Sequence, residues 1–93
     1  MQAEQIKKVV LAGAGTMGTS MSQIFAAHGY ETVLYNHREV TLEKARRMIE
    51  LNQQALVRSG ELSAAESDAV KERITFTAGD GCFADCDIVV ESI

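Results

Sequence analysis

The sequence predicts an α/β protein in which helices flank a parallel sheet, and three observations support this fold class. Short β-branched apolar runs alternate along the chain with longer segments of helical periodicity. Three glycines cluster where the first apolar run passes into the first helical segment. The chain has 93 residues, 46 % hydrophobic and 24 % charged, which suits one small globular domain spanning residues 1–93.

The first part of the chain carries strand, helix and strand signals in that order. Residues 8–12 form a β-branched apolar run, typical of a strand buried on both faces. Helical spacing begins at residue 16 and Gly29 follows as a stop signal; the recurring side chains are Met17, Met21, Ile24, Phe25 and His28. Residues 31–35 return to side chains that favour strands.

The second part of the chain predicts two helices and two further strands. Residues 41–59 carry an apolar stripe that ends at Gly60. Ser63 and Glu66 have the spacing of a capping box, which predicts a short helix reaching about residue 73. Residues 74–77 and 87–92 read as a third strand and a fourth, buried one, joined by a turn-rich segment. Right-handed crossovers then predict a mostly parallel sheet covered on both faces.

Charge and composition exclude several classes of function. The net charge of −4, without a basic stripe, argues against nucleic acid or an anionic membrane as the main partner. The apolar stretches are too short to span a membrane or to form a signal peptide, so we expect a cytoplasmic protein. The spacing of Cys82 and Cys86 matches neither a redox nor a zinc motif, and we expect both to be buried as small apolar side chains.

The glycine cluster has the G-x-G-x-x-G spacing of a dinucleotide-binding turn between a strand and a helix. Gly13 would permit the tight turn, Gly15 would let the backbone approach a diphosphate, and Gly18 would let the helix pack closely on the strand. The N–H groups around Thr16, Met17 and Gly18 would then face the pyrophosphate at the positive end of the helix dipole. The predicted fold is therefore the first half of a Rossmann-type dinucleotide-binding domain.

The order of these segments resembles the N-terminal NAD-binding part of 3-hydroxyacyl-CoA dehydrogenases. The resemblance rests on GAGTMG, on a long helical insertion after the second strand, and on a D-x-V-x-E pattern at Asp87, Val89 and Glu91. It implies hydride transfer between a nicotinamide ring and carbon 3 of an acyl-CoA, with the cofactor carrying the hydride. Related β-hydroxyacid and 6-phosphogluconate dehydrogenases share the glycines, but the segment GELSAAESDAVKERI is less like theirs.

The resemblance assigns no catalytic residue to this chain. The family's general base is a histidine paired with a glutamate, and both follow the fourth strand; His28 and His37 match neither position. The acyl-CoA pocket and the dimerisation domain of the family also lie beyond that strand. We therefore expect a fragment that binds the cofactor without turning over substrate, and we expect residues 87–92 to expose a sheet edge that favours a homo-oligomer.

Asn36 marks a departure from the family pattern that bears on cofactor choice. The family usually has aspartate here, which binds the adenine ribose and repels a 2′-phosphate. Asn36 keeps hydrogen-bonding capacity without the charge, and Arg38 is placed to pair with a 2′-phosphate, to stack on adenine, or to stay solvated beside Glu39. His37 is expected beside the adenine ribose. The sequence therefore predicts NAD as cofactor, with weakened discrimination against NADP.

The end of the fourth strand supplies the remaining candidate site residues. Ser92 and Ile93 are expected to line the cofactor crevice, and Glu91 is either a ligand of the nicotinamide ribose or an ordinary strand-end acid. Two other classes stay open on the residues alone. The chain could be a non-catalytic module that senses NAD(P), or an FAD-binding domain, although such domains usually have glutamate where this chain has Asn36.

Overall fold

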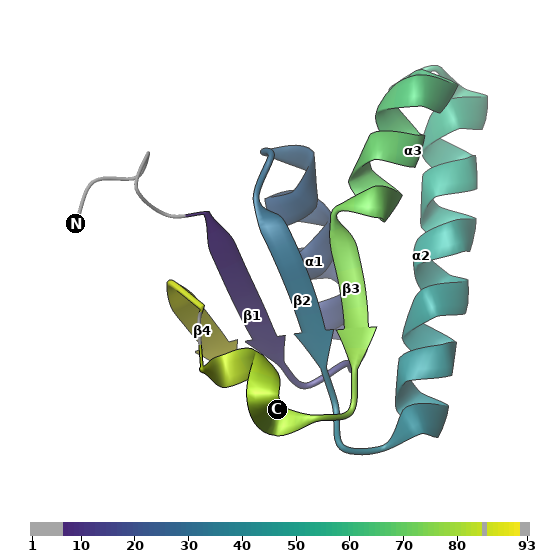
Figure 1. The fold of residues 1–93 in the computed structure, drawn as a ribbon. Helices are drawn as coiled ribbons and strands as arrows, with labels where there is room; N and C mark the ends of the chain where they lie inside the picture. The colour runs from purple at the N-terminus through teal and green to yellow at the C-terminus, as the bar shows by residue number, and fades with distance from the viewer. Residues whose placement is uncertain (1–6, 85, 92–93) are drawn as a thin grey trace.

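The computed structural model describes residues 7–84 and 86–91, and its core is one four-stranded sheet. The strands are parallel in the order β3-β2-β1-β4 (Figure 1). The elements along the chain are β1 (Lys8–Ala12), α1 (Thr16–Ala27), β2 (Glu31–Tyr35), α2 (Glu39–Ser59), α3 (Ala64–Glu72), β3 (Ile74–Thr77), the short 3-10 helix η2 (Asp80–Phe83) and β4 (Ile88–Glu91). The predicted α/β fold class and its alternation of elements are confirmed.

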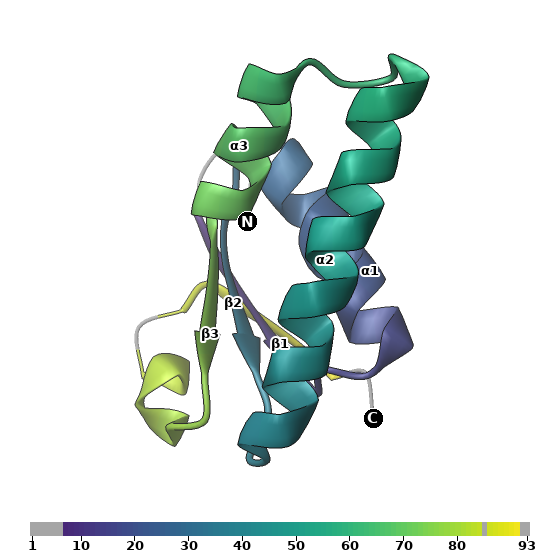
Figure 2. The ribbon, with the colours of Figure 1, turned by 90° about the vertical axis from the view of Figure 1, so that its right-hand side faces the viewer.

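The two faces of the sheet are covered by different kinds of structure. The helices α1, α2 and α3 lie on one side, and the segment with η2 crosses the other (Figures 1 and 2). This follows from handedness, because β4 lies on the opposite side of β1 from β2 and β3, so a right-handed crossover to it uses the opposite face. On that face the Phe83 ring packs edge-on against Tyr35, with centroids 4.9 Å apart.

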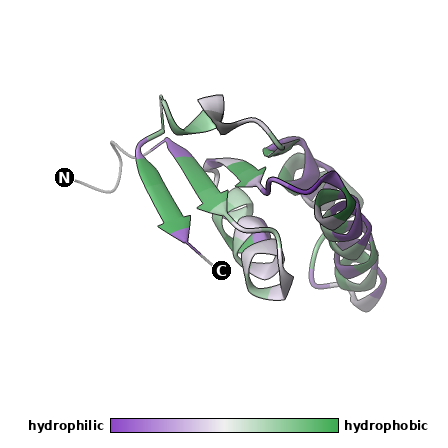
Figure 3. Ribbon diagram, turned by 90° about the horizontal axis from the view of Figure 1, so that it is seen from below, coloured by the Kyte–Doolittle hydropathy of each residue, from purple (hydrophilic) through white to green (hydrophobic). Residues whose placement is uncertain are grey.

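The centre of the sheet is the most completely buried part of the described chain. Val9, Val10 and Leu11 of β1 are fully buried, and Leu34 of β2 is as well. Their side chains alternate between the two faces, so burial of all of them requires cover on both. Figure 3, which views the carboxyl edge of the sheet, shows the strands as hydrophobic and α2 as a mixture of hydrophilic and hydrophobic residues.

Small residues form the buried face of α1. Gly18, Ser22 and Ala26, spaced four apart, are buried together with Thr19, whereas Met17 and Ile24 are 68 % and 57 % exposed. The apolar spacing predicted the helix correctly but not the side that packs on the sheet. Close approach of α1 to the strands needs small side chains, so Met21 and Phe25 pack at the margin of the core and are only partly buried.

The helices α2 and α3 form a hairpin with well-defined ends. Gly60 ends α2 with a φ of 84°, and Ser63 and Glu66 complete the predicted capping box at the start of α3. The helix α2 begins at Glu39, two residues before the predicted start, because the Arg38 carbonyl already accepts the N–H groups of Thr41 and Leu42.

Two burial predictions near the end of the chain are wrong. The strand β4 is alternately half-buried and exposed, with Val89 44 % exposed, because in the described chain it is an edge strand paired only with β1. Cys82 and Cys86 are only partly buried, since they lie in the segment that crosses the outer surface of the sheet.

Candidate functional site

The turn after β1 requires glycine at position 13. Gly13 has a φ of 113°, a region that residues with a Cβ rarely occupy. Its N–H donates to the Tyr35 carbonyl at 2.8 Å, which ties the turn to the end of β2. The backbone thus turns sharply at the carboxyl edge of the sheet, as the sequence predicts for Gly13.

Gly15 has no such internal reason to be glycine. Its φ of −72° and ψ of −171° are extended values that any residue adopts. A Cβ added there would meet no protein atom within 4 Å, so packing does not demand glycine either. The space that a side chain would fill lies open to solvent at the start of α1. A ligand that must approach the backbone at this point would account for the glycine.

The first turn of α1 presents its positive end to the same space. Gly15 is the N-cap, no side chain caps the helix, and its first turn contains no acidic residue. The first N–H groups of an α-helix have no acceptor within the helix, so Thr16, Met17 and Gly18 lie where an anion is favoured. Thr16 and Met17 are exposed there, and Gly18 is buried against the sheet.

Asn36 joins the glycine turn to the start of α2. Its Oδ1 accepts the Ala14 N–H at 3.3 Å, and its Nδ2 donates to the Arg38 carbonyl at 3.2 Å. The side chain therefore lies beside the glycine turn, half-buried, with one amide hydrogen and one oxygen lone pair still available. An asparagine held in this way can bond a ribose hydroxyl but carries no charge that repels a phosphate.

His37 and Arg38 are both exposed at the same edge, immediately after Asn36. Arg38 is the N-cap residue of α2, and its guanidinium forms no ion pair with any residue that the structure describes. The structure thus places Asn36 against the glycine turn, with His37 and Arg38 exposed directly after it.

The two acids of the D-x-V-x-E pattern lie at opposite ends of β4. The Asp87 Oδ2 accepts the N–H groups of Lys7 at 2.8 Å and Lys8 at 2.9 Å, and these bonds hold the pKa of Asp87 below its usual value. Asp87 therefore anchors the amino end of the sheet. Glu91 reaches the carboxyl edge, exposed and in register with Ala12 of β1. The predicted site residues Ser92 and Ile93 lie outside the described part of the chain.

Two grooves open near this edge, on opposite sides of α2. One, of about 220 Å³, adjoins Gly15 and is lined by Ala14, Gly15, Thr16, Thr19, Thr41, Lys44, Ala45 and Met48. The other, of about 580 Å³, lies between α2 and β3 and is lined by Glu39, Val40, Leu42, Glu43, Arg46, Phe76, Thr77 and Ala78. Thr41 and Lys44 were not predicted as site residues; their spacing of three on the helix that follows Asn36 was the available signal.

Two features are missing from the residues that the structure describes. They contain no cluster of three or more His, Cys, Asp or Glu side chains that could hold a metal ion. Among their helices, none has the length and apolar character needed to cross a membrane.

Comparison with known proteins gives a consistent family. A relative from Deinococcus radiodurans, named probable 3-hydroxybutyryl-CoA dehydrogenase, is 36% identical over 86 residues, covering 92% of this chain and 31% of that protein. The crystal structure of M. tuberculosis FadB2 superposes with a TM-score of 0.91 at 26% identity, over 95% of this chain and 31% of that one. The crystal structure of 3-hydroxybutyryl-CoA dehydrogenase from Escherichia coli K12 has a TM-score of 0.89 at 27% identity, over 92% of this chain and 18% of that one.

The family match covers nearly the whole chain. The profile of the family described as 3-hydroxyacyl-CoA dehydrogenase, NAD binding domain, matches residues 8–93. The chain spans about a third of the length of the first curated relatives, 31% to 32%. The glycine turn, the open start of α1 and the strand order all lie within the matched region, and the chain belongs to the family of 3-hydroxyacyl-CoA dehydrogenase NAD-binding domains.

Proposed function

We propose that this chain binds the adenosine and pyrophosphate part of a nicotinamide dinucleotide within a 3-hydroxyacyl-CoA dehydrogenase. The observation that carries the proposal is Gly15, a glycine that neither its backbone angles nor its packing explains. A diphosphate lying against the backbone would use this space, and the N–H groups of the first turn of α1 would donate to it. A side chain at position 15 would occupy the same space.

Asn36 and Glu91 each have a defined task in this proposal. Asn36 bonds a hydroxyl of the adenine ribose, because its side chain lies beside the glycine turn. Glu91 stands at the end of β4, next to the end of β1, where ligands of open parallel sheets bind, and it faces the nicotinamide half. When the dinucleotide is bound, its nicotinamide ring supplies the hydride chemistry, and these residues bind and orient the dinucleotide.

Two observations support 3-hydroxyacyl-CoA thioesters as the substrate class of the whole enzyme. The family is named for that reaction, and the curated relatives include a 3-hydroxybutyryl-CoA and a 3-hydroxyadipyl-CoA dehydrogenase.

His28 caps the far end of α1 and His37 lies beside Asn36, so neither is placed at the β1–β4 crevice as a general base. The 93-residue chain mixed with NADH and acetoacetyl-CoA should therefore show no loss of NADH absorbance above the uncatalysed rate.

For the cofactor we propose NAD, with weakened discrimination against NADP. The family description supports NAD. Asn36 in place of a carboxylate, with the exposed Arg38 two residues on, removes a repulsive charge and adds an attractive one for a 2′-phosphate. For the cellular location we propose the cytoplasm, on the basis of composition alone.

Calorimetric titration with NADH tests the binding site directly. In the variant Gly15→Val the side chain fills the space of the pyrophosphate, so we expect binding to be lost while the circular-dichroism spectrum and melting temperature stay the same. The matched control is Gly81→Val, because a Cβ at this exposed glycine also meets no protein atom within 4 Å. Unchanged NADH affinity in Gly15→Val would show that the dinucleotide lies elsewhere.

A further inference from the structure

The smaller groove lies between the first turns of α1 and α2, directly beside Gly15. Its polar lining comes from Thr16 and Thr19 on α1 and from Thr41 and Lys44 on α2; the Thr19 hydroxyl donates to the Ala14 carbonyl, and none of the described lining residues is acidic. Its volume of about 220 Å³ is below the roughly 300 to 1,000 Å³ of pockets that enclose a drug-sized ligand. The groove therefore suits one substituent of a larger ligand whose remainder lies outside it.

The helix α2 separates its charges between its two sides. Thr41 and Lys44, three residues apart, face α1, whereas Glu39 and Glu43 line the larger groove on the β3 side. No carboxylate of a described residue lies within 4 Å of the Lys44 ammonium. In the larger groove the Arg46 guanidinium instead lies 4.4 Å above the Phe76 ring. An anion is therefore favoured in the smaller groove and disfavoured in the larger one.

Backbone contacts connect the smaller groove to Asn36. Ala14, which lines the groove, donates its N–H to the Asn36 Oδ1 at 3.3 Å. The Arg38 carbonyl accepts both the Asn36 Nδ2 at 3.2 Å and the Thr41 N–H at 3.2 Å. A ribose bonded to Asn36 would thus lie between the glycine turn and the first turn of α2, at the mouth of the groove.

From this arrangement we infer that the smaller groove is a phosphate subsite that receives the 2′-phosphate of NADP(H). The inference rests on the proposed function and deepens it, because it names the residues that decide between the two cofactors. Lys44 supplies a point charge, the Thr41 hydroxyl donates a hydrogen bond, and Arg38 approaches from the rim. NAD leaves the groove without an anion, so Thr41 and Lys44 contribute to NADP(H) affinity alone.

Two small nucleotides isolate this subsite, because 2′,5′-ADP differs from 5′-AMP only by the 2′-phosphate. Titrated into the chain at low ionic strength, 2′,5′-ADP should bind roughly 10-fold more tightly, the scale of a partly screened charge-assisted contact. Lys44→Gln should bring the two affinities close together and leave that of 5′-AMP unchanged. The control Arg58→Gln removes an exposed cation in the last turn of the same helix and should keep the preference. Lys44→Gln should likewise lower the affinity for NADPH and leave that for NADH unchanged.

The outcomes separate the subsite from the proposed function. Equal affinity for 2′,5′-ADP and 5′-AMP, with NADH still bound, would overturn the phosphate subsite and leave the dinucleotide site standing. A preference that survives Lys44→Gln would show that the phosphate lies elsewhere and would equally overturn the assignment. A chain that binds none of these nucleotides would overturn the subsite and the proposed function together.

Discussion

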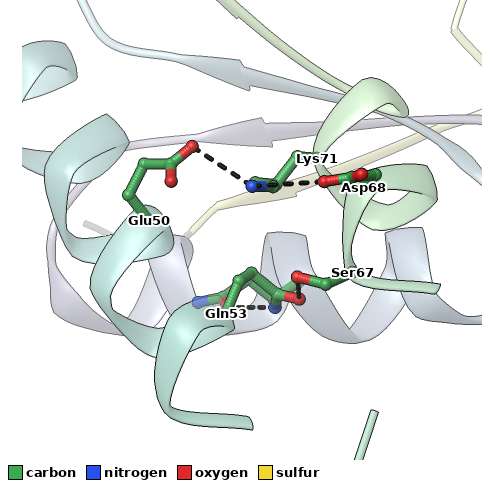
Figure 4. A network of polar contacts seen from close by, with 6 residues as sticks. Glu50, Gln53, Ser67, Asp68 and Lys71 are labelled. Atoms are coloured by element: carbon green, nitrogen blue, oxygen red, sulfur yellow. Dashed lines mark hydrogen bonds and ion pairs between the residues drawn. The ribbon is translucent and has the colours of Figure 1, made fainter. Parts of the chain in front are cut away.

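The carboxyl edge of the sheet and the junction of the three helices use polar side chains in opposite ways. At the junction, the buried Gln53 of α2 donates through Nε2 to the Gln23 Oε1 of α1 at 2.7 Å, and its Oε1 accepts the Ser67 hydroxyl of α3 at 2.9 Å (Figure 4). Nearby, Lys71 lies 3.5 Å from Glu50 and 3.6 Å from Asp68. At the carboxyl edge, Arg38 and Lys44 pair with no described carboxylate.

The difference separates polar groups that hold the fold from those available to a ligand. Among the described residues, every buried side-chain nitrogen and oxygen has a hydrogen-bond partner. Gln53, only 2 % exposed, completes its bonds within the protein, because an unsatisfied buried amide is costly. The cations at the carboxyl edge are exposed to water, so they need no partner from the protein and remain available to a ligand. Substitutions at the helix junction should therefore lower stability, whereas substitutions at the carboxyl edge should change ligand affinity.

The largest expected effect is that of Gln53→Ala on stability. The change leaves a cavity and removes the partners of Gln23 and Ser67, so the free energy of unfolding should fall by about 2 to 4 kcal/mol. Urea denaturation measures the loss, and the exposed neighbour Gln54→Ala should change stability by about 0.5 kcal/mol or less. NADH affinity of the folded fraction should stay the same. A Gln53→Ala chain as stable as the parent would show that this buried amide does not hold the three helices together.

Arg38→Ala should show the reverse pattern. Removing the guanidinium should weaken NADPH binding, by no more than the roughly 10-fold that the 2′-phosphate contributes, and leave NADH binding and the urea midpoint nearly unchanged. Asn36→Asp should also favour NADH, because it restores a carboxylate that repels the 2′-phosphate. Equal losses for both cofactors in Arg38→Ala would assign the side chain to the adenine or to the fold.

Asp87 lies at the amino end of the sheet, and its hydrogen bonds predict that stability depends on pH. Backbone N–H groups lower its pKa in the folded chain, so its contribution to stability is present above the unfolded value of about 3.9 and is lost as pH falls through the folded pKa. Melting temperatures measured from pH 7 downward should show this acid loss, and Asp87→Asn should reduce it. An identical acid profile in Asp87→Asn would mean that the bonds to Lys7 and Lys8 do not stabilise the fold.

The smallest expected effect is on the oligomeric state. It follows from β4, whose apolar side chains are partly exposed, whereas those of β1 are buried. Among the described strands β4 lies at the edge of the sheet, and an edge strand can pair with a second copy, so we expect light scattering at about 100 μM to show a dimer or larger assembly. Val89→Lys places a charge on this exposed strand and should shift the chain toward monomer, with little change in NADH affinity. A parent chain that is monomeric at that concentration would contradict the predicted homo-oligomer.

Local sequence determined most of the elements and the turn that begins the site. Alternating apolar runs and helical spacing predicted the strands and helices, because each pattern follows from a backbone period. The Ser63–Glu66 capping box and the φ of Gly13 are properties of a few adjacent residues, so neighbours in sequence sufficed to predict them. The sequence placed Asn36 at the end of the second strand, and the structure adds that its Oδ1 accepts the Ala14 N–H of the glycine turn.

Tertiary packing decided which side chains are buried and which are free. Local spacing predicted close packing at Gly18 but not that Ser22 and Ala26 are buried while Met17 and Ile24 are exposed, because the distance between helix and strands selects the size of side chain that fits. Only three helices meeting in space give Gln53 its partners. Lys44 enters the candidate site for the same reason: the docking of α2 beside α1 brings it next to Gly15, from which 29 positions separate it in the sequence.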